Sequence, residues 1–210
     1  MTTPHSTSQP ITLYGFKLSG HCHRVELLLN LIELPYRYID VNLRGGEHKK
    51  PEFLAMNSFG QVPVIDDHGF KLADSNAILI YLASRYAPQW YPPDGLQQAQ
   101  LQKWFSVAAG SLAYGPAMAR RIKIFGSKED PAAAIDRANS LFNVMNAELN
   151  YQPFLVGAQP TLADIAMYAY TARAPEGDVS LDPFPNVQAW LARVEALPRF
   201  VPMSHAQPRQ

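Results

Sequence analysis

Asp74 and Ser75 open a predicted helix directly after a predicted strand, where their side chains could take part in binding. A helix start presents free backbone amides and a partial positive charge, so this position suits a bound carboxylate. The Asp74 carboxylate could at the same time pair with an ammonium group. The alternative is that either side chain only caps the helix, which is a common role for Asp and Ser.

A second candidate binding segment is Gln61-Val62-Pro63, where another strand should begin. Proline has no amide donor, so it is tolerated at the start of a strand but not in a central ladder. If the Val62–Pro63 bond is cis, the Val62 amide and carbonyl can turn outward and pair with an extended peptide backbone. Trans is the default from sequence alone, because roughly 5–6% of such bonds are cis in folded proteins.

The run His21-Cys22-His23 suggests a metal site, but we predict none. A structural zinc site needs four ligands, and nothing nearby in the sequence completes the set. Cys22 is the single cysteine of the chain, which forbids an internal disulfide and a cysteine-rich zinc site.

The elements that position these residues alternate between strand and helix patterns. Val25, Leu28, Leu29 and Ile32 have the spacing of a helix packed on a sheet. The expected order is a strand at 11–14, a helix from 22, a strand at 36–41, a short helix at 51–54, strands at 62–65 and 70–72, and a helix from 75. The first two strands need a crossover and should be parallel. This order predicts an α/β layer.

Composition changes at residues 87–95, which contain three prolines and one glycine. Such a segment is typical of a domain boundary, and only helical patterns follow it. We expect a domain at 10–86, a linker at 87–96 and an all-helical domain at 97–204. The expected helices are 96–125 with a kink at Gly115-Pro116, 131–150, one after Pro160, and 185–197. Thr161 and Asp164 should form a capping box.

Composition excludes several classes of protein. The 210 residues include 18 basic and 18 acidic side chains, and this balance argues against nucleic acid as the main partner. No apolar run approaches the roughly 18 residues that a membrane span needs. The first ten residues lack the basic start and apolar stretch of a secretory signal, and we expect them to be frayed. We therefore expect a cytoplasmic globular protein with no membrane partner.

Three ordered motifs resemble the cytosolic glutathione S-transferase family: GEHK at 46–49 before PEFL at 51–54, NSFGQVPV at 57–64, and ADS at 73–75. The GEHK run is similar to the phi class, and the residues 161–164 match the family's capping box. The resemblance implies a thioredoxin-like α/β N-terminal domain and an all-α C-terminal domain. It also implies glutathione as co-substrate and a homodimer, with the first domain of one subunit against the second domain of its mate.

The resemblance assigns roles to individual residues. Asp74 and Ser75 would hold the γ-glutamyl end of glutathione, and Val62 would pair with its cysteinyl backbone. His48, Lys49 and Gln61 match positions that contact the tripeptide; the two basic residues would lie near the glycine carboxylate. Asp74 stands where many members have Glu, which keeps the charge and shortens the reach. A role as solvated loop residues stays open for His48 and Lys49.

The residue that activates the glutathione thiol is expected between the first strand and the first helix. Ser19 lies five residues before Arg24, which resembles the spacing of the catalytic serine in serine-type members. Lowering a thiol pKa by two units needs about 2.7 kcal/mol. One hydrogen bond to a charged group supplies about 1.5–3 kcal/mol, and a helix N-terminus adds about 0.3–1 kcal/mol. One hydroxyl is therefore enough, with Tyr14 and Cys22 as the alternatives.

The second substrate is expected to bind against the helical domain. Tyr114, Met118 and Arg121 would edge a pocket for a hydrophobic electrophile, although a charged run of this kind is also typical of a solvated helix face. We expect a glutathione transferase that conjugates the thiolate to such electrophiles. A glutathione-dependent peroxidase or disulfide reductase using Cys22 is an alternative, and so is a non-catalytic regulatory protein that binds glutathione.

Overall fold

A four-stranded sheet in the order β2-β1-β3-β4 forms the centre of the first part of the chain in the computed structural model, which describes residues 10–206. β1 (Ile11–Gly15) pairs in parallel with β2 (Tyr36–Asp40) and antiparallel with β3 (Val64–Asp67). β4 (Phe70–Ala73) pairs antiparallel with β3. The predicted parallel pair, joined by a crossover helix, is confirmed.

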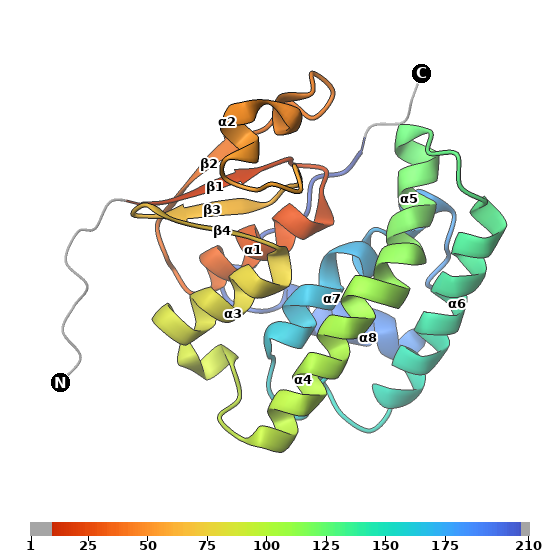
Figure 1. Cartoon of the computed structure of the whole chain (residues 1–210). Helices are drawn as coiled ribbons and strands as arrows, with labels where there is room; N and C mark the ends of the chain where they lie inside the picture. Colours follow the sequence, from red (N-terminus) through yellow and green to blue (C-terminus); the bar gives the residue numbers. More distant parts are fainter. Residues whose placement is uncertain (1–9, 207–210) are drawn as a thin grey trace.

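Helices cover both faces of this sheet (Figure 1). α1 (Gly20–Leu31) and α3 (Ser75–Tyr86) lie on one face, and the short α2 (Pro51–Leu54) lies on the other. The α1 and α3 side has a large core, to which Leu13, Leu28 and Ile78 contribute fully buried side chains. The α2 side has a smaller cluster of three buried residues: Val41, Phe53 and Val64. Both faces of the sheet are therefore sealed by apolar contacts, which fixes its loops in place.

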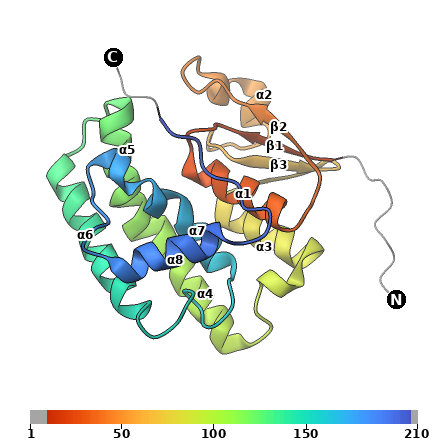
Figure 2. The same ribbon diagram turned by 180° about the vertical axis from the view of Figure 1, so that it is seen from behind.

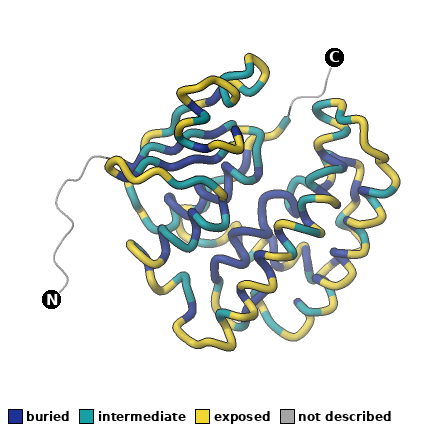
Figure 3. Tube along the Cα trace, viewed as in Figure 1, coloured by how far each residue is buried: buried dark blue, intermediate teal, exposed yellow. Residues whose placement is uncertain are grey.

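The second part of the chain is a bundle of five α-helices within the described residues. Their bounds are α4 (Gly95–Val107), α5 (Pro116–Phe125), α6 (Pro131–Glu148), α7 (Leu162–Ala172) and α8 (Pro185–Glu195). α7 lies at the centre, and its residues 162–171 are all buried. Figure 3 shows this interior in dark blue, whereas much of α6 faces solvent. α7 packs against α1, so it joins the bundle to the sheet domain.

The predicted kink at Gly115-Pro116 is confirmed, and the structure adds a π-helical turn at Ala108–Leu112. A Cβ added at Gly115 would lie 2.7 Å from the Ser111 carbonyl oxygen and 2.9 Å from the Ala138 amide nitrogen, so only glycine fits here. Proline then starts α5 because its missing amide is tolerated at the first helical position. The expected single helix is therefore two helices, and α5 takes a direction of its own.

The strand expected at 62–65 begins two residues later, at Val64. The Val62–Pro63 bond is cis. Pro63 has no amide to donate to the ladder, which explains why pairing starts after it.

The predicted capping box at Thr161 and Asp164 is confirmed and does more than start α7. The Asp164 carboxylate is fully buried, and it accepts from the amides of Thr161 at 2.8 Å and Leu155 at 3.0 Å. It also accepts from Trp190 Nε1 at 2.8 Å. Asp164 thus ties α7 to α8 and to the loop before α7.

After α8 the chain runs back across α1 (Figure 2). His23 Nε2 donates to the Val201 carbonyl at 2.8 Å, which fastens this segment to the sheet domain. The prediction that residues 1–10 form a frayed tail without a secretory signal falls almost entirely on residues 1–9, which lie outside the described part. Within residues 10–206 no helix has the length and apolar character needed to cross a membrane.

Candidate active site

A cavity of about 930 Å³ opens between the sheet domain and the helical bundle. Its lining comes from the β1–α1 loop, the segment around α2, the start of α3, and helices α5 and α7. The lining residues are Phe16, Leu18, Ser19, His21, Leu43, Arg44, His48, Lys49, Asn57, Phe59, Gly60, Gln61, Val62, Pro63, Ala73, Asp74, Ser75, Ala117, Arg120, Arg121, Phe125 and Tyr170.

Eight of the ten residues singled out from the sequence lie on this one cavity. They are Ser19, His48, Lys49, Gln61, Val62, Asp74, Ser75 and Arg121. Tyr114 and Met118 are absent from the lining. The side chain of Tyr114 is 56% exposed, because the break before Pro116 leaves it outside the cavity. The sulfur of Met118 instead accepts from Arg121 Nη2 at 3.2 Å.

Ser19 stands at the N-terminus of α1, directly on the cavity. It has an extended backbone, and its hydroxyl oxygen accepts from the Cys22 amide at 3.4 Å. That bond is long, and the hydroxyl proton stays available for another partner. The free amides of the first turn and the helix dipole add positive potential at the same point. An anion beside Ser19 would therefore be stabilised by both the hydroxyl and the helix.

Cys22 and Tyr14 do not reach the cavity wall. The Cys22 thiol is 1% exposed and accepts from the Phe16 amide at 3.3 Å. Burial raises the pKa of this thiol to about 11, so it stays protonated at neutral pH. Tyr14 packs beside the buried cluster on the α2 side of the sheet. Of the three candidates for thiol activation, Ser19 alone lines the cavity.

Asp74 and Ser75 form the N-terminus of α3. One Asp74 oxygen, Oδ1, accepts from the amides of Asn76 at 3.0 Å and Ala77 at 2.9 Å, so the carboxylate does cap the helix. The backbone of Asp74 has φ 70°, a conformation that side-chain-bearing residues rarely adopt. Non-glycine residues in such conformations cluster at ligand-binding sites.

A buried positive charge lies beneath this helix start. The side chain of Arg24 is 1% exposed and donates to Ser75 Oγ at 3.2 Å and to Asn76 Oδ1 at 2.7 Å. Burial lowers the pKa of Arg24 to about 10, which leaves it charged at neutral pH. Its Nε and Nη2 atoms have no hydrogen-bond partner within residues 10–206. The start of α3 therefore offers a strongly positive environment for a carboxylate.

Three basic side chains also line the cavity. They are Arg44, His48 and Lys49. Lys49 Nζ donates to the Gly60 carbonyl at 3.2 Å, which holds the loop before β3 against the 3₁₀ turn Glu47–Lys49. Gly60 has φ 58°, and a Cβ there would lie 2.8 Å from the His48 carbonyl oxygen, so this close approach needs glycine. Arg44 was missed from the sequence because its loop carries no regular pattern.

The Val62 backbone also lines this cavity. Within the described part of the chain, no hydrogen bond joins the Val62 amide or carbonyl to another residue. Asn57 Nδ2 donates to the Gln61 carbonyl at 2.8 Å and thereby fixes the turn that precedes Val62. The Val62 backbone is thus free to pair with an extended peptide.

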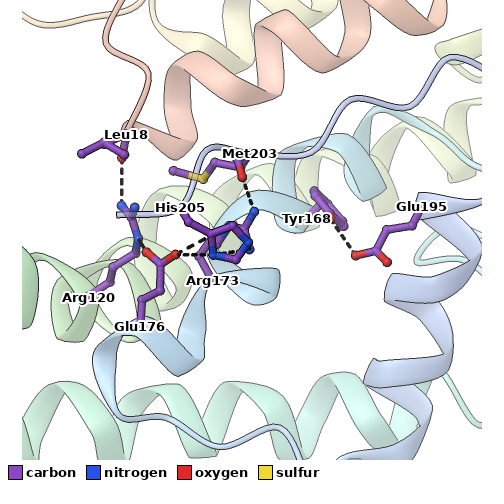
Figure 4. A network of polar contacts seen from close by, with 8 residues as sticks. All are labelled: Leu18, Arg120, Tyr168, Arg173, Glu176, Glu195, Met203 and His205. Atoms are coloured by element: carbon purple, nitrogen blue, oxygen red, sulfur yellow. Dashed lines mark hydrogen bonds and ion pairs between the residues drawn. The ribbon is translucent and has the colours of Figure 1, made fainter. Parts of the chain in front are cut away.

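The bundle contributes an arginine that crosses to the Ser19 loop (Figure 4). Arg120 is 2% exposed, and its Nη1 donates to the Leu18 carbonyl at 2.8 Å. Its Nε donates to Glu176 Oε2 at 2.7 Å. Glu176 also faces Arg173 and His205, and Arg173 donates to the Met203 carbonyl. This network fastens the residue before Ser19 to the bundle and to the C-terminal segment.

The comparisons with known proteins agree with this geometry. The N-terminal domain model of the glutathione S-transferases matches residues 9–84, and the C-terminal domain model of the same family matches residues 101–198. The chain belongs to the glutathione S-transferase family. It is 32% identical to glutathione S-transferase 3 of Zea mays over 91% of both chains. A crystal structure of a glutathione S-transferase from Pseudomonas fluorescens is 36% identical and superposes with a TM-score of 0.88, covering 93% of this chain and 99% of that one.

Further relatives carry the same family name. Human glutathione S-transferase theta-2 is 29% identical over 82% of this chain and 81% of its own length. These relatives support glutathione transferase function for this chain. The expected fold, a thioredoxin-like domain followed by a helical domain, is confirmed. Within residues 10–206 of this glutathione S-transferase, no group of three or more His, Cys, Asp or Glu side chains could hold a metal ion.

Proposed function

We propose that this transferase binds glutathione along the sheet-domain side of the cavity, and that Ser19 stabilises its thiolate for attack on an electrophile held against α5. The observation that carries the proposal is that predicted residues far apart in the sequence meet at one site. Residues predicted from five separate stretches of sequence line a single cavity, with Ser19 among them. Segments this far apart in the chain share one cavity only through folding.

The charges of the cavity match those of the tripeptide. Glutathione has two carboxylates and one ammonium group. The γ-glutamyl carboxylate would bind at the start of α3, above the buried Arg24, and the glycine carboxylate near His48 and Lys49. Asp74 uses only Oδ1 for capping, which leaves Oδ2 for the ammonium group. The free Val62 backbone would pair with the cysteinyl residue between these ends.

This placement brings the cysteinyl sulfur to the start of α1. The Ser19 hydroxyl would then donate a hydrogen bond to the sulfur anion, without acting as a base. The thiol proton goes to solvent, and the thiolate attacks the electrophilic carbon. With an aryl halide, the carbon–sulfur bond forms as the carbon–halogen bond breaks, and the halide leaves with the electron pair of that bond. Placement of the two reactants and stabilisation of the anion supply the rate gain.

The electrophile would lie against an apolar wall made by both domains. Phe16 and Phe125 face each other with ring centroids 6.2 Å apart, and Ala117 lines the same cavity. Arg121 adds a partly exposed charge at the edge of this wall. Of the helical-domain residues predicted for this role, the proposal keeps Arg121 and replaces Tyr114 and Met118 with Ala117 and Phe125.

The proposal also includes a homodimer in the cytoplasm. Exposed apolar side chains occur on both domains: Phe59 is 78% exposed in the sheet domain and Val144 is 54% exposed on α6. A groove between α4 and α6 lies beside Val144. Contact between the first domain of one subunit and the second domain of its mate would cover such residues. The unpaired Cys22 thiol suits a reducing compartment.

Calorimetric titration with glutathione, followed by an aryl halide conjugation assay, tests this function. The wild-type protein should bind glutathione and form the conjugate. Asp74→Asn should weaken glutathione binding by about 10- to 100-fold, because it removes a charged partner of the ammonium group while keeping the shape. Tight binding with no conjugation of any aryl halide would favour a regulatory protein instead, and absent binding would reject the site.

A further inference from the structure

Both polar ends of the peptide bond before Ser19 are held by hydrogen bonds. The Ser19 amide donates to the Phe16 carbonyl at 2.8 Å. The Leu18 carbonyl accepts from Arg120 Nη1 at 2.8 Å, and no other donor within residues 10–206 reaches it. A peptide bond is planar, so its amide and its carbonyl turn together. The contact with Arg120 therefore helps to fix the backbone from which the Ser19 side chain projects.

The helical bundle holds Arg120 itself in place (Figure 4). Its side chain is 2% exposed, and its Nε donates to Glu176 Oε2 at 2.7 Å. Glu176 belongs to the 3₁₀ helix Ala174–Gly177, which packs closely on α5. A Cβ added at Gly177 would lie 2.9 Å from Arg120 Cα, so only glycine allows this approach. Because the guanidinium group is planar and rigid, the bond to Glu176 also directs Nη1 towards the Leu18 carbonyl.

The direction of the Ser19 hydroxyl decides how well it can stabilise a thiolate. A hydrogen bond weakens steeply when its donor angle falls below about 120°. In an active site, a displacement of about 1 Å can lower the rate roughly 100-fold. Leu18, Ser19 and Arg120 all line the cavity, so the held peptide bond lies where the sulfur is proposed to bind. A peptide bond free to turn at Leu18 would misdirect the hydroxyl and weaken its bond to the sulfur.

We propose that Arg120 is a positioning residue, which holds the Leu18–Ser19 peptide bond so that the Ser19 hydroxyl points at the glutathione sulfur. This inference rests on the proposed function. Arg120 comes from α5 of the bundle, whereas Ser19 and the predicted glutathione contacts come from the sheet domain. The helical domain thus takes part in activating glutathione as well as in binding the electrophile.

Arg120→Lys tests the proposal without leaving Glu176 unpaired. Lysine keeps a positive charge for that carboxylate, but its side chain is one atom shorter, so it should lose the bond to the Leu18 carbonyl. The thiolate absorbance of bound glutathione is titrated with pH, and kcat/KM for an aryl halide is measured over the same range. The variant should raise the thiol pKa by about 0.5 to 1.5 units, because a misdirected hydroxyl supplies only part of its hydrogen-bond energy. Below that pKa, kcat/KM should fall about 3- to 30-fold.

Arg173→Lys is the matched control. The Arg173 side chain is 13% exposed, and its Nε lies 3.8 Å from the other oxygen of Glu176. It donates to the Met203 carbonyl of the C-terminal segment instead of the Leu18 carbonyl. This variant shortens a second arginine of the same network and should leave the thiol pKa and the pH profile of kcat/KM unchanged. A shift equal to that of Arg120→Lys would make the effect a general loosening of the network and would overturn the proposal.

A double-mutant cycle with Ser19→Ala decides whether Arg120 acts through Ser19. In the Ser19→Ala background, Arg120→Lys should cause no further change in the thiol pKa. A shift that persists undiminished would mean that Arg120 acts on the sulfur without Ser19, and an unchanged pKa in the single variant would mean that it has no role. Either result rejects the proposal. Failure of the proposed function is distinct, since the wild-type protein would then show no glutathione thiolate at all.

Discussion

Replacing Ser19 with alanine tests the chemistry of this transferase most directly. The variant removes the hydroxyl that faces the cavity and leaves the backbone amides of α1 in place. A hydrogen bond to a charged group contributes about 1.5–3 kcal/mol, and one pKa unit corresponds to 1.36 kcal/mol. Ser19→Ala should therefore raise the pKa of bound glutathione by roughly 1 to 2 units.

The sign of the pH dependence follows from this shift. Below the wild-type thiol pKa, the variant holds less thiolate, and kcat/KM for an aryl halide should fall roughly 10- to 100-fold. Above the raised pKa both proteins hold glutathione as thiolate, so the two rates should approach each other. Ultraviolet absorbance of the bound thiolate gives the pKa, and steady-state kinetics give the profile.

A loss of folding stability should explain little of the activity that Ser19→Ala loses. The capping bond from the Cys22 amide to Ser19 Oγ is long, at 3.4 Å, so its loss should cost about 0.5–1 kcal/mol of stability. Ser19→Thr is the control, because it keeps a hydroxyl and a competent cap and should retain most of the activity. A thiolate pKa that is the same in the alanine variant and the wild type would refute the role of Ser19.

Three further predictions concern residues that do not line the cavity. Cys22→Ala should keep aryl halide conjugation within about threefold of wild type, since this buried thiol stays protonated; loss of conjugation in the assay would restore Cys22 as a candidate. Glu176→Gln should lower the free energy of unfolding in urea by about 2 kcal/mol, because it leaves the buried Arg120 without a carboxylate; the figure lies below that for a fully buried pair because Glu176 is partly exposed. Burial lowers the pKa of His23 to about 4. Below pH 6.5 the unfolded chain therefore binds a proton at His23 that the native protein does not bind. The contribution of His23 to the free energy of unfolding is lost as the pH falls from 6.5 towards 4. Between pH 7.5 and 5 it should cost roughly 2 kcal/mol of stability, and His23→Gln should shrink the measured difference; an unchanged difference would contradict this account.

Much of the glutathione half of the site follows from local sequence. The helix start at Asp74 and the turn before Val62 are set by residues within a few positions of each other, and backbone rules govern such spans. The same holds for the capping box at Thr161, whose two partners are three residues apart. The family resemblance then assigned ligand contacts to these local features.

The helical side of the site could not be placed in this way. Arg120 and Arg121 are neighbours of the same type in the sequence, and only packing decides that Arg120 is buried against Leu18 while Arg121 stays half exposed. The π-helical turn at Ala108–Leu112 changes the direction of the side chains that directly follow it, because each extra residue in a turn rotates later side chains about the helix axis. Tyr114 lies just past this turn and points away.

The sequence by itself determined the two-part fold, the helix starts and the residue types that suit a peptide with two carboxylates, an ammonium group and a thiol. Tertiary structure decided which side chains reach the reactive end of the cavity. The Arg120 contact with the Leu18 carbonyl joins residues 102 positions apart, and Tyr170 of the bundle lines the same cavity as Ser19 of the sheet domain. Periodicity and capping act over one or two helical turns, whereas contacts of this length exist only once α1 has packed against α7.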